Sequence, residues 1–368
     1  MVVIVSQRCR LGRWCTHGEL AVVRARCRRV RNADAMTVAE QVVVFALAAI
    51  VSLATSWVLV TRLERIGERI GLSEALLGLL AALAADTPEI TSAVTALAHN
   101  QRDVGAGVVI GSNVFNLAAL LGIGAIVAGR ISLHRRVVVL SGAIAMWVAM
   151  VCVATIGGGF GPGVGLLLSL AVFVPYIVVL GTHRRGLDWL PLPHRTTGWI
   201  SIAVDEEELE LDEAFRPARG RPVDIVVAAI SLVVVVAASV LMERSATSLG
   251  THFAVPGLIV GGVVLAAVTS LPNAVAAIYL AAKGRGAAML STALNSNSLN
   301  VIAGLLLPAV FLGVSSPSGS SDLIGAWYVG LTAVALGFAY ADRGLRRLSG
   351  WVIVFGYAGF VAALFAVT

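Results

Sequence analysis

ADTPEITSAVTALAHNQRDVGAGVVIGSNVFN, at residues 85–116, places proline, acidic and asparagine residues within strongly apolar surroundings. A second stretch, VTSLPNAVAAIYLAAKGRGAAMLSTALNSNSLN at residues 268–300, follows the same plan at a constant offset of 184 residues. The positions at which both stretches have the same proline, serine or asparagine are Pro88 and Pro272, Ser112 and Ser296, Asn113 and Asn297, and Asn116 and Asn300. Such residues are unfavourable inside apolar helices, so their recurrence at equivalent places indicates an internal repeat.

The composition around the two stretches is that of an integral membrane protein. Hydrophobic residues make up 58% of the 368 residues and charged residues 13%, against roughly 25% in a soluble protein. The mean hydropathy is +0.90. The net charge is +6, and the charged residues lie between the apolar runs. We therefore expect the partner to be a lipid bilayer and not a nucleic acid. The composition also excludes a cytosolic enzyme. Runs long enough to cross a bilayer predict ten spans, near residues 38–60, 72–98, 104–128, 137–156, 164–181, 223–242, 254–282, 287–314, 323–341 and 350–368.

The ten spans divide into two halves of five. Residues 36–181 form the first repeat and residues 223–368 the second, with the linker 182–222 between them. Because five is an odd number, the second half enters the membrane inverted. We therefore predict an all-α membrane protein with two inverted five-helix repeats and broken helices at its centre. Secondary transporters have this architecture, with the binding site near the midplane; a duplicated bundle without transport is the alternative.

The loop charges predict the orientation. Seventeen basic residues lie in the loops on the linker side and two, Arg102 and Arg244, in the opposite loops, where Glu243 and Arg244 are expected to mark a span end. Basic loops stay in the cytoplasm, so we expect a plasma-membrane protein with the linker inside and both termini outside.

The linker carries an acidic run from Asp205 to Glu208. Such a run is most often a solvated tether; a regulatory cation site is the alternative.

The segment 1–35 contradicts this orientation. It holds eight arginines and no clear span, and its short apolar start precedes the charges, unlike a signal peptide. We expect translation to start at Met36, directly before the first span.

The interrupted spans collect oxygen-bearing side chains. Pro88 and Pro272 each remove a backbone donor, so carbonyls near residues 84–85 and 268–269 are expected to face a cavity. No histidine or cysteine lies among these residues, which disfavours zinc or copper and favours Na⁺ or Ca²⁺. The candidate ligands are Asp86, Thr87, Glu89, Thr91, Ser92, Ser112, Asn113, Asn116, Thr269, Ser270, Asn273, Asn295, Ser296, Asn297 and Asn300.

Glu89 is the most informative of these residues. A carboxylate in the middle of a span is by default a functional hypothesis, although a protonated structural glutamate is the alternative. Asp86 lies three residues earlier, on the same face of a regular helix. Two close carboxylates either bind a divalent cation or share a proton. We therefore expect protons to compete with the bound cation.

At these residues the chain resembles the calcium/cation antiporter superfamily, the group that contains sodium/calcium exchangers. The resemblance covers both repeats and most of residues 36–368. It rests on GSNVFN at 111–116, TSLP at 269–272, SNSLN at 296–300 and Pro88-Glu89. Members carry Na⁺ and Ca²⁺ alternately through a midplane site. The resemblance implies that its ligands are Glu89, Asn113, Thr269, Ser270, Asn273 and Asn297, with Ser112 and Ser296 beside them.

One segment in each repeat departs from the superfamily pattern. Asn273 stands where the second repeat usually has glutamate, and Ala84-Ala85-Asp86 replaces Gly-Thr-Ser in the first. One acid is lost from one half and another appears in the other, so the core keeps two carboxylates. We therefore place Asp86 with Glu89 as the charged ligands of the transported cation.

The function predicted is a secondary antiporter that exchanges Na⁺ for Ca²⁺ or a related cation by alternating access. One alternative is a cation/proton antiporter in which Glu89 or Asp86 carries the proton. Another is an uncoupled cation-binding or regulatory membrane protein, which Asn273 prompts. A membrane enzyme is disfavoured because the spans contain no pair of histidines. The ions are substrates, and no resident cofactor is expected.

Overall fold

The computed structural model describes residues 36–182, 193–214, 220–315 and 317–368. The predicted start at Met36 concerns residues 1–35, which lie outside this range. Residues up to Val43 and residues from Val44 onwards form separate units. In the first unit, Thr37 and Glu40 each donate a backbone N–H to the other's side chain, at 2.7 and 3.2 Å. This reciprocal cap fixes the start of the first long helix.

The described residues are almost entirely helical. The first half contains α3 (Val38–Ile70), α4 (Glu74–Ala85), α5 (Thr87–Ala98), α6 (Arg102–Asn116), the π-helical η1 (Leu117–Ile123), α7 (Gly124–Ala128), strand β1 (Arg130–Ser132), α8 (Arg135–Ile156) and α9 (Pro162–Thr182). Between the halves lies α10 (His194–Ala214). The second half contains α11 (Pro222–His252), α12 (Gly257–Ile259), the π-helical η3 (Val260–Leu265), α13 (Ala266–Thr269), α14 (Leu271–Ala282), α15 (Gly286–Leu299), the π-helical η4 (Asn300–Leu306), α16 (Leu307–Leu312), α17 (Gly319–Ala341), strand β2 (Gly344–Arg346) and α18 (Arg347–Val367).

The predicted number of spans is confirmed. In the described part of the chain, eight segments are long and apolar enough to cross a membrane, and two bent helix pairs bring the number to ten. The first pair, α4 and α5, bends by 47°, and the second, α12–α13 and α14, bends by 45°. Each S-N-x-x-N motif leads into a π-helical segment: η1 begins directly after Asn116, and η4 begins at Asn300. The internal repeat is therefore visible in the backbone as well as in the sequence.

Proline explains the position of each break. Pro88 and Pro272 both lie in the first turn after the break, where a missing N–H removes no helical hydrogen bond. The expectation that the carbonyls near residues 84–85 face a cavity is wrong for Ala84. Its oxygen accepts a hydrogen bond from the Ser56 hydroxyl of α3 at 3.2 Å. A neighbouring helix thus satisfies the group that the break releases.

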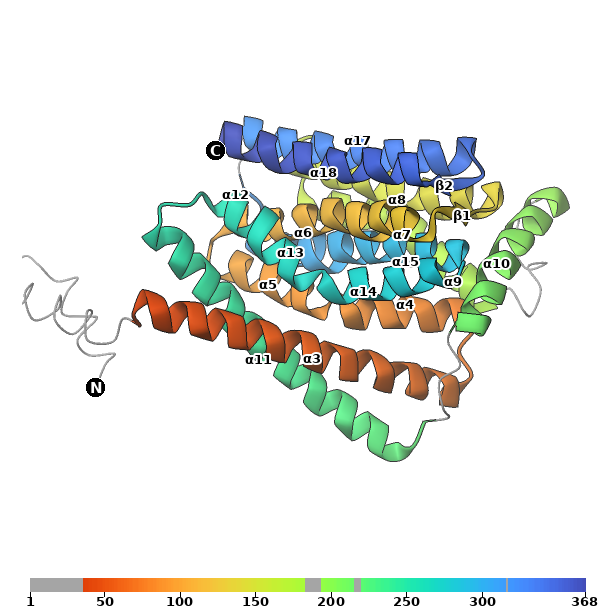
Figure 1. Ribbon diagram of the computed structural model, residues 1–368, viewed down its shortest axis with the longest axis horizontal. Coiled ribbons are helices and arrows are strands. Elements are labelled where there is room, and N and C mark those ends of the chain that lie inside the picture. The colour runs from red at the N-terminus through yellow and green to blue at the C-terminus, as the bar shows by residue number, and fades with distance from the viewer. Residues whose placement is uncertain (1–35, 183–192, 215–219, 316) are drawn as a thin grey trace, which may run out of the picture. The chain divides into compact units, whose positions relative to one another are not determined.

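Glycines bring the two halves into close contact. The helix α6 packs against η3 of the other repeat, at the centre of the bundle (Figure 1). A Cβ atom on Gly111 would lie 2.2 Å from the Gly262 carbonyl oxygen, and one on Gly261 would lie 2.3 Å from that of Val104. Both positions therefore require glycine, and membrane helices commonly approach through such small residues.

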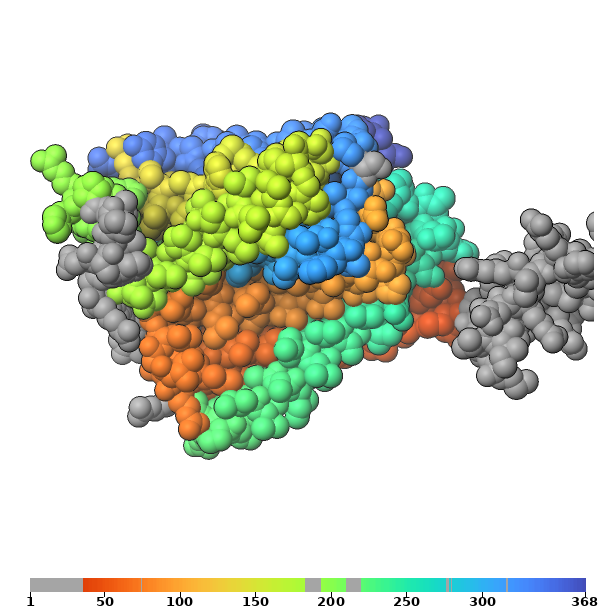
Figure 2. Space-filling model, turned by 180° about the vertical axis from the view of Figure 1, so that it is seen from behind, coloured from red at the N-terminus to blue at the C-terminus, as the bar shows by residue number. Residues whose placement is uncertain are grey.

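Peripheral helices present apolar side chains outwards. Figure 2 shows α9 in yellow-green and α11 in green on one face of the molecule. Leu167 on α9 and Val233 on α11 are 69% and 68% exposed. Lipid chains are the natural environment for such surfaces.

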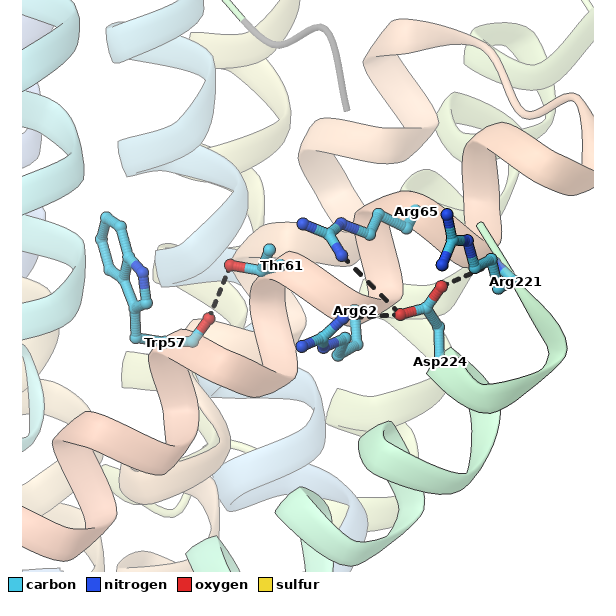
Figure 3. A network of polar contacts seen from close by, with 6 residues as sticks. All are labelled: Trp57, Thr61, Arg62, Arg65, Arg221 and Asp224. Atoms are coloured by element: carbon cyan, nitrogen blue, oxygen red, sulfur yellow. Dashed lines mark hydrogen bonds and ion pairs between the residues drawn. The ribbon is translucent and has the colours of Figure 1, made fainter. Parts of the chain in front are cut away.

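An ion-pair network joins the end of α3 to the start of α11 (Figure 3). Asp224 accepts from the Arg62 guanidinium at 2.7 Å and from the Arg221 backbone at 2.6 Å, and Arg65 lies at 3.9 Å. The Gly220 N–H also donates to the Arg65 carbonyl at 3.1 Å. These contacts connect the first span of each repeat at the linker side.

The acidic linker is not simply a solvated tether, so that interpretation is wrong for part of it. The helix α10 packs against α4, α8 and α15, and Glu207 and Glu208 are only 1% and 6% exposed. Glu207 accepts a hydrogen bond from Ser291 of α15. Residues 183–192 and 215–219 of the linker lie outside the described residues.

Candidate cation site

The two helix breaks meet at Asp86. This residue is the junction between α4 and α5, and its side chain is fully buried. The Asn273 amide of α14 and the Ser296 hydroxyl of α15 both donate to Asp86 Oδ1, each at 2.7 Å. The carboxylate of one repeat is therefore held by two side chains of the other.

Glu89 makes the matching contact with Ser270, again as the acceptor. Its Oε1 accepts from the Ser270 hydroxyl at 2.7 Å, and both side chains are fully buried. At the offset of 184 residues, Ser270 is the equivalent of Asp86, and Asn273 is the equivalent of Glu89. The same two positions thus pair reciprocally across the two repeats. This arrangement follows from two copies of one broken helix that face each other.

Asparagines extend this symmetry to α6 and α15. The Asn113 amide donates to the Asn297 carbonyl at 3.0 Å, and the Asn297 amide donates to the Asn113 carbonyl at 3.1 Å. Asn116 donates to Ser296 Oγ at 3.2 Å and to Asn297 Oδ1 at 3.1 Å. Asn300 donates to Asn113 Oδ1 at 3.3 Å. These bonds fix the orientation of the amides next to the two acids.

Several buried oxygens around this point have no hydrogen-bond partner. They are Asp86 Oδ2, Glu89 Oε2, Ser92 Oγ, Asn116 Oδ1 and Asn300 Oδ1. An unsatisfied buried polar atom is unfavourable by about 1–3 kcal/mol, and more when it carries charge. Four of the five are acceptors only, so a cation can satisfy them whereas another acceptor cannot.

Two predicted ligands use their hydroxyl protons locally. Ser112 donates to the Val108 carbonyl at 2.6 Å, and Thr269 donates to the Leu265 carbonyl at 2.9 Å. Both are fully buried and lie on the segments that carry Asn113 and Ser270. With the proton directed to the helix, the lone pairs of each hydroxyl oxygen remain available to a cation.

Asn295 belongs to a different group. Its amide donates to Ser291 at 3.0 Å, the residue that also binds Glu207 of the linker helix. Asn295 therefore lies towards α10 rather than among the central oxygens. Conversely, Asn116 and Asn300 have a larger part in the network than the superfamily pattern implies, and their repeated S-N-x-x-N spacing is the sequence signal for it.

The donor chemistry fits a hard cation. In the described part of the chain, no three His, Cys, Asp or Glu side chains are grouped so as to hold a metal ion. The donors are instead two carboxylates with hydroxyl and amide oxygens, which suit Na⁺ or Ca²⁺ and not zinc. No Lys or Arg forms an ion pair with Asp86 or Glu89 among the described residues, so a cation or protons must neutralise them.

Comparison with known proteins agrees with this fold. The model of the family described as "Sodium/calcium exchanger protein" matches residues 40–183 and 223–366. "Inner membrane protein YrbG" of Escherichia coli (strain K12) is 26% identical over 246 residues, which cover 65% of this chain and 70% of that protein. "Putative antiporter CaxA" of Alkalimonas amylolytica is 23% identical over 315 residues, 82% of this chain and 91% of that protein.

Solved structures show the same architecture. The sodium-calcium exchanger NCX_Mj, soaked with 10 mM Na⁺ and zero Ca²⁺, superposes with a TM-score of 0.59 at 19% identity, covering 89% of this chain and 100% of that chain. Native YfkE gives a TM-score of 0.62 at 17% identity, covering 89% and 92%. At these identities the likeness establishes the fold, which is the predicted ten-helix inverted repeat.

Proposed function

Because the chain belongs to the sodium/calcium exchanger protein family, we propose that it exchanges Na⁺ for Ca²⁺, or for a related cation, at the Asp86–Glu89 site. The family and the ten spans make the chain a multi-pass membrane transporter of cations and not an enzyme. The choice of ions and the mechanism are the proposal.

One observation carries this proposal. Asp86 Oδ2 and Glu89 Oε2 are buried carboxylate oxygens without a hydrogen-bond partner, at the point where the two repeats meet. Ca²⁺ binds six to eight oxygens, including carboxylates. The proposed ligands are Asp86, Glu89, Ser112, Asn113, Thr269, Ser270, Asn273, Ser296 and Asn297, with Asp86 and Glu89 in direct contact with the metal ion.

Alternating access is the mechanism that we propose for this site. In inverted-repeat transporters the site stays near the midplane while the surrounding helices expose it to one side and then the other. Two ionised carboxylates without a cation are strongly unfavourable in a low-dielectric environment. The empty site therefore resists reorientation, whereas a site neutralised by one Ca²⁺ or two Na⁺ reorients. This difference couples the two ion flows.

Cation/proton exchange is the second candidate. It is favoured by the absence of an ion pair to Asp86 or Glu89 among the described residues, since protons could also neutralise the pair. Direct proton coupling makes flux follow a pH gradient in the absence of Na⁺. The orientation proposed with either function has the linker in the cytoplasm and both termini outside the plasma membrane.

The decisive experiment is uptake of ⁴⁵Ca²⁺ and ²²Na⁺ into proteoliposomes with opposed Na⁺ or H⁺ gradients. An outward Na⁺ gradient should make the wild type accumulate ⁴⁵Ca²⁺, and Glu89→Gln should abolish that accumulation. Asp342→Asn is the matched control, because this carboxylate lies in the loop after α17 beside Arg346. Accumulation driven by H⁺ alone would favour the second candidate. Ca²⁺ that equilibrates without countertransport would contradict both and favour the uncoupled alternative.

A further inference from the structure

Glu243 is a buried carboxylate that the central site does not use. The sequence predicts that it marks the end of a span, and in the structure the helix α11 continues past it to His252. The residue is 1% exposed, and its Oε2 has no hydrogen-bond partner. Among the described residues Arg244 forms no ion pair with Glu243 and contacts His99 Nε2 at 3.3 Å, although both basic side chains lie close enough to interact electrostatically with Glu243. Among the described residues, only the Thr247 hydroxyl donates to Glu243, at 3.1 Å.

Glu243 belongs to a polar stripe along α11. Ser239, Glu243, Thr247 and Thr251 follow one another at intervals of four residues, so they lie on one face of the helix. Thr251 donates to the Thr247 carbonyl at 2.9 Å, and Ser239 is bonded to Ser52 of α3 at 2.9 Å. A continuous polar face on a membrane helix implies contact with water, ions or other polar groups rather than lipid.

The C-terminal end of this stripe, at Thr247 and Thr251, borders a cavity of about 610 Å³. Thr247 and Thr251 line it together with Gln101, Arg102 and Asp103 at the start of α6 and Ser318 at the start of α17. The cavity lies at the α12 end of the bundle, opposite the linker helix α10 (Figure 1). Glu243 lies one helical turn before Thr247 in the chain, and so one turn away from the cavity wall.

At Glu243 the stripe lies beside α5, the helix that carries Glu89, whereas Ser239 at the far end of the stripe contacts α3. The helices α5 and α11 pack against each other, and the contact between His99 and Arg244 places the last turn of α5 beside Glu243. Further down α5, Ser92 has a buried hydroxyl without a partner, three residues from Glu89. The packed pair α5 and α11 therefore buries two oxygen-bearing side chains with an unpartnered oxygen, Glu243 one turn from Thr247 and Ser92 three residues from Glu89.

We propose that Glu243 is a cation-binding side chain on the access route between this cavity and the central site. It would hold Na⁺ or Ca²⁺ through its carboxylate and the Thr247 hydroxyl oxygen, both hard donors, before the ion reaches Glu89. This inference rests on the proposed transport function. It assigns Glu243 to ion entry and not to the reorientation of the loaded site.

The test is a comparison of flux kinetics with the cation presented on each side of the membrane. In oriented proteoliposomes, Glu243→Gln should raise the KM for Ca²⁺ on the cavity side about ten-fold, which corresponds to about 1.4 kcal/mol of lost binding. The KM on the linker side and the rate at saturating Ca²⁺ should stay unchanged. Thr247→Val, which removes one hydroxyl at nearly constant shape, should shift the same KM in the same direction by a smaller factor.

The control is Asp322→Asn, which removes an exposed carboxylate from the first turn of α17, at the same end of the bundle. A cavity-side KM that stays the same in both Glu243→Gln and Thr247→Val would overturn the inference while leaving the transport function intact. Equal changes on both sides, or a fall in maximal rate alone, would assign Glu243 a structural role and overturn it as well. A wild type without coupled flux would remove the transport function itself, and this inference with it.

Discussion

The Asn273 amide donates to the Asp86 carboxylate at 2.7 Å, and this bond joins the broken helix of one repeat to that of the other. The reciprocal bond from Ser270 to Glu89 has the same length. In the pair Asp86–Asn273 the acid is at the position equivalent to Ser270. In the pair Glu89–Ser270 the acid is at the position equivalent to Asn273. Both acids come from the first repeat, and the second repeat supplies neutral donors. The site is therefore symmetric in its contacts and asymmetric in its charge.

This asymmetry predicts that the acid can be moved between repeats. Asp86→Ser should weaken Ca²⁺ binding about ten-fold or more, because one charged ligand is lost. Asn273→Glu in the same chain should restore much of that loss, since it returns a second carboxylate to the facing position. Equilibrium ⁴⁵Ca²⁺ binding to purified protein measures both steps. Additive losses in the double variant would show that Asp86 does not replace the second-repeat acid.

Cation affinity should fall as the pH is lowered. Asp86 and Glu89 bind a cation only in their ionised form, so protons compete for the same oxygens. In the range where one competing proton binds, each unit of decrease in pH raises the KM for Ca²⁺ up to about ten-fold. Initial rates of ⁴⁵Ca²⁺ uptake at several pH values, with no pH gradient, test this. A KM that does not change with pH would contradict the role of these carboxylates as ligands.

The glycine contact between α6 and η3 should be intolerant of even one methyl group. In Gly111→Ala the new Cβ would lie 2.2 Å from the Gly262 carbonyl oxygen, which is backbone and cannot rotate away. We expect a loss of about 1–3 kcal/mol of stability, measured as a lower Tm in detergent. Gly337→Ala on α17 is the control, because no atom lies within 4 Å of its added Cβ. A Gly111→Ala variant as stable as the control would argue against this packing.

The proposed orientation predicts which loops face the cytoplasm. Asp342 lies in the loop after α17 and Asp322 in the first turn of the same helix, so the two are at opposite ends of one span. In whole cells, a membrane-impermeant thiol reagent should label Asp322→Cys and should leave Asp342→Cys unlabelled until the cells are opened. The reverse pattern would show that the linker faces outwards.

The spans and their breaks were predictable from sequence because they depend on local properties. Apolar length identifies a span, and proline marks the position where the helix must restart. The chemistry of the site followed from Glu89 and the repeated S-N-x-x-N motif. The ten spans, the two broken pairs and the membership of the exchanger family are confirmed.

The remaining features depend on contacts between distant parts of the chain. The sequence around Ala84 does not reveal that the Ser56 hydroxyl of another helix donates a hydrogen bond to its carbonyl oxygen. The acidic run of α10 looks the same in sequence whether it is solvated or packed, and only the position of α15 brings Ser291 to Glu207. The length of α11 was underestimated because Glu243 resembles the charged end of a span. For Ala84 and Glu207, a tertiary partner contacts a polar group that sequence reasoning assigned to a cavity or to water.

The most direct measurement is a crystal structure of this protein soaked with Ca²⁺ or with its heavier analogue Sr²⁺, located by anomalous scattering. A strong peak should lie between the repeats, with Ca²⁺ about 2.3–2.6 Å from Asp86 Oδ2 and Glu89 Oε2. A structure in which these two carboxylates stay bonded only to Asn273, Ser296 and Ser270, while the cation binds elsewhere, would contradict it.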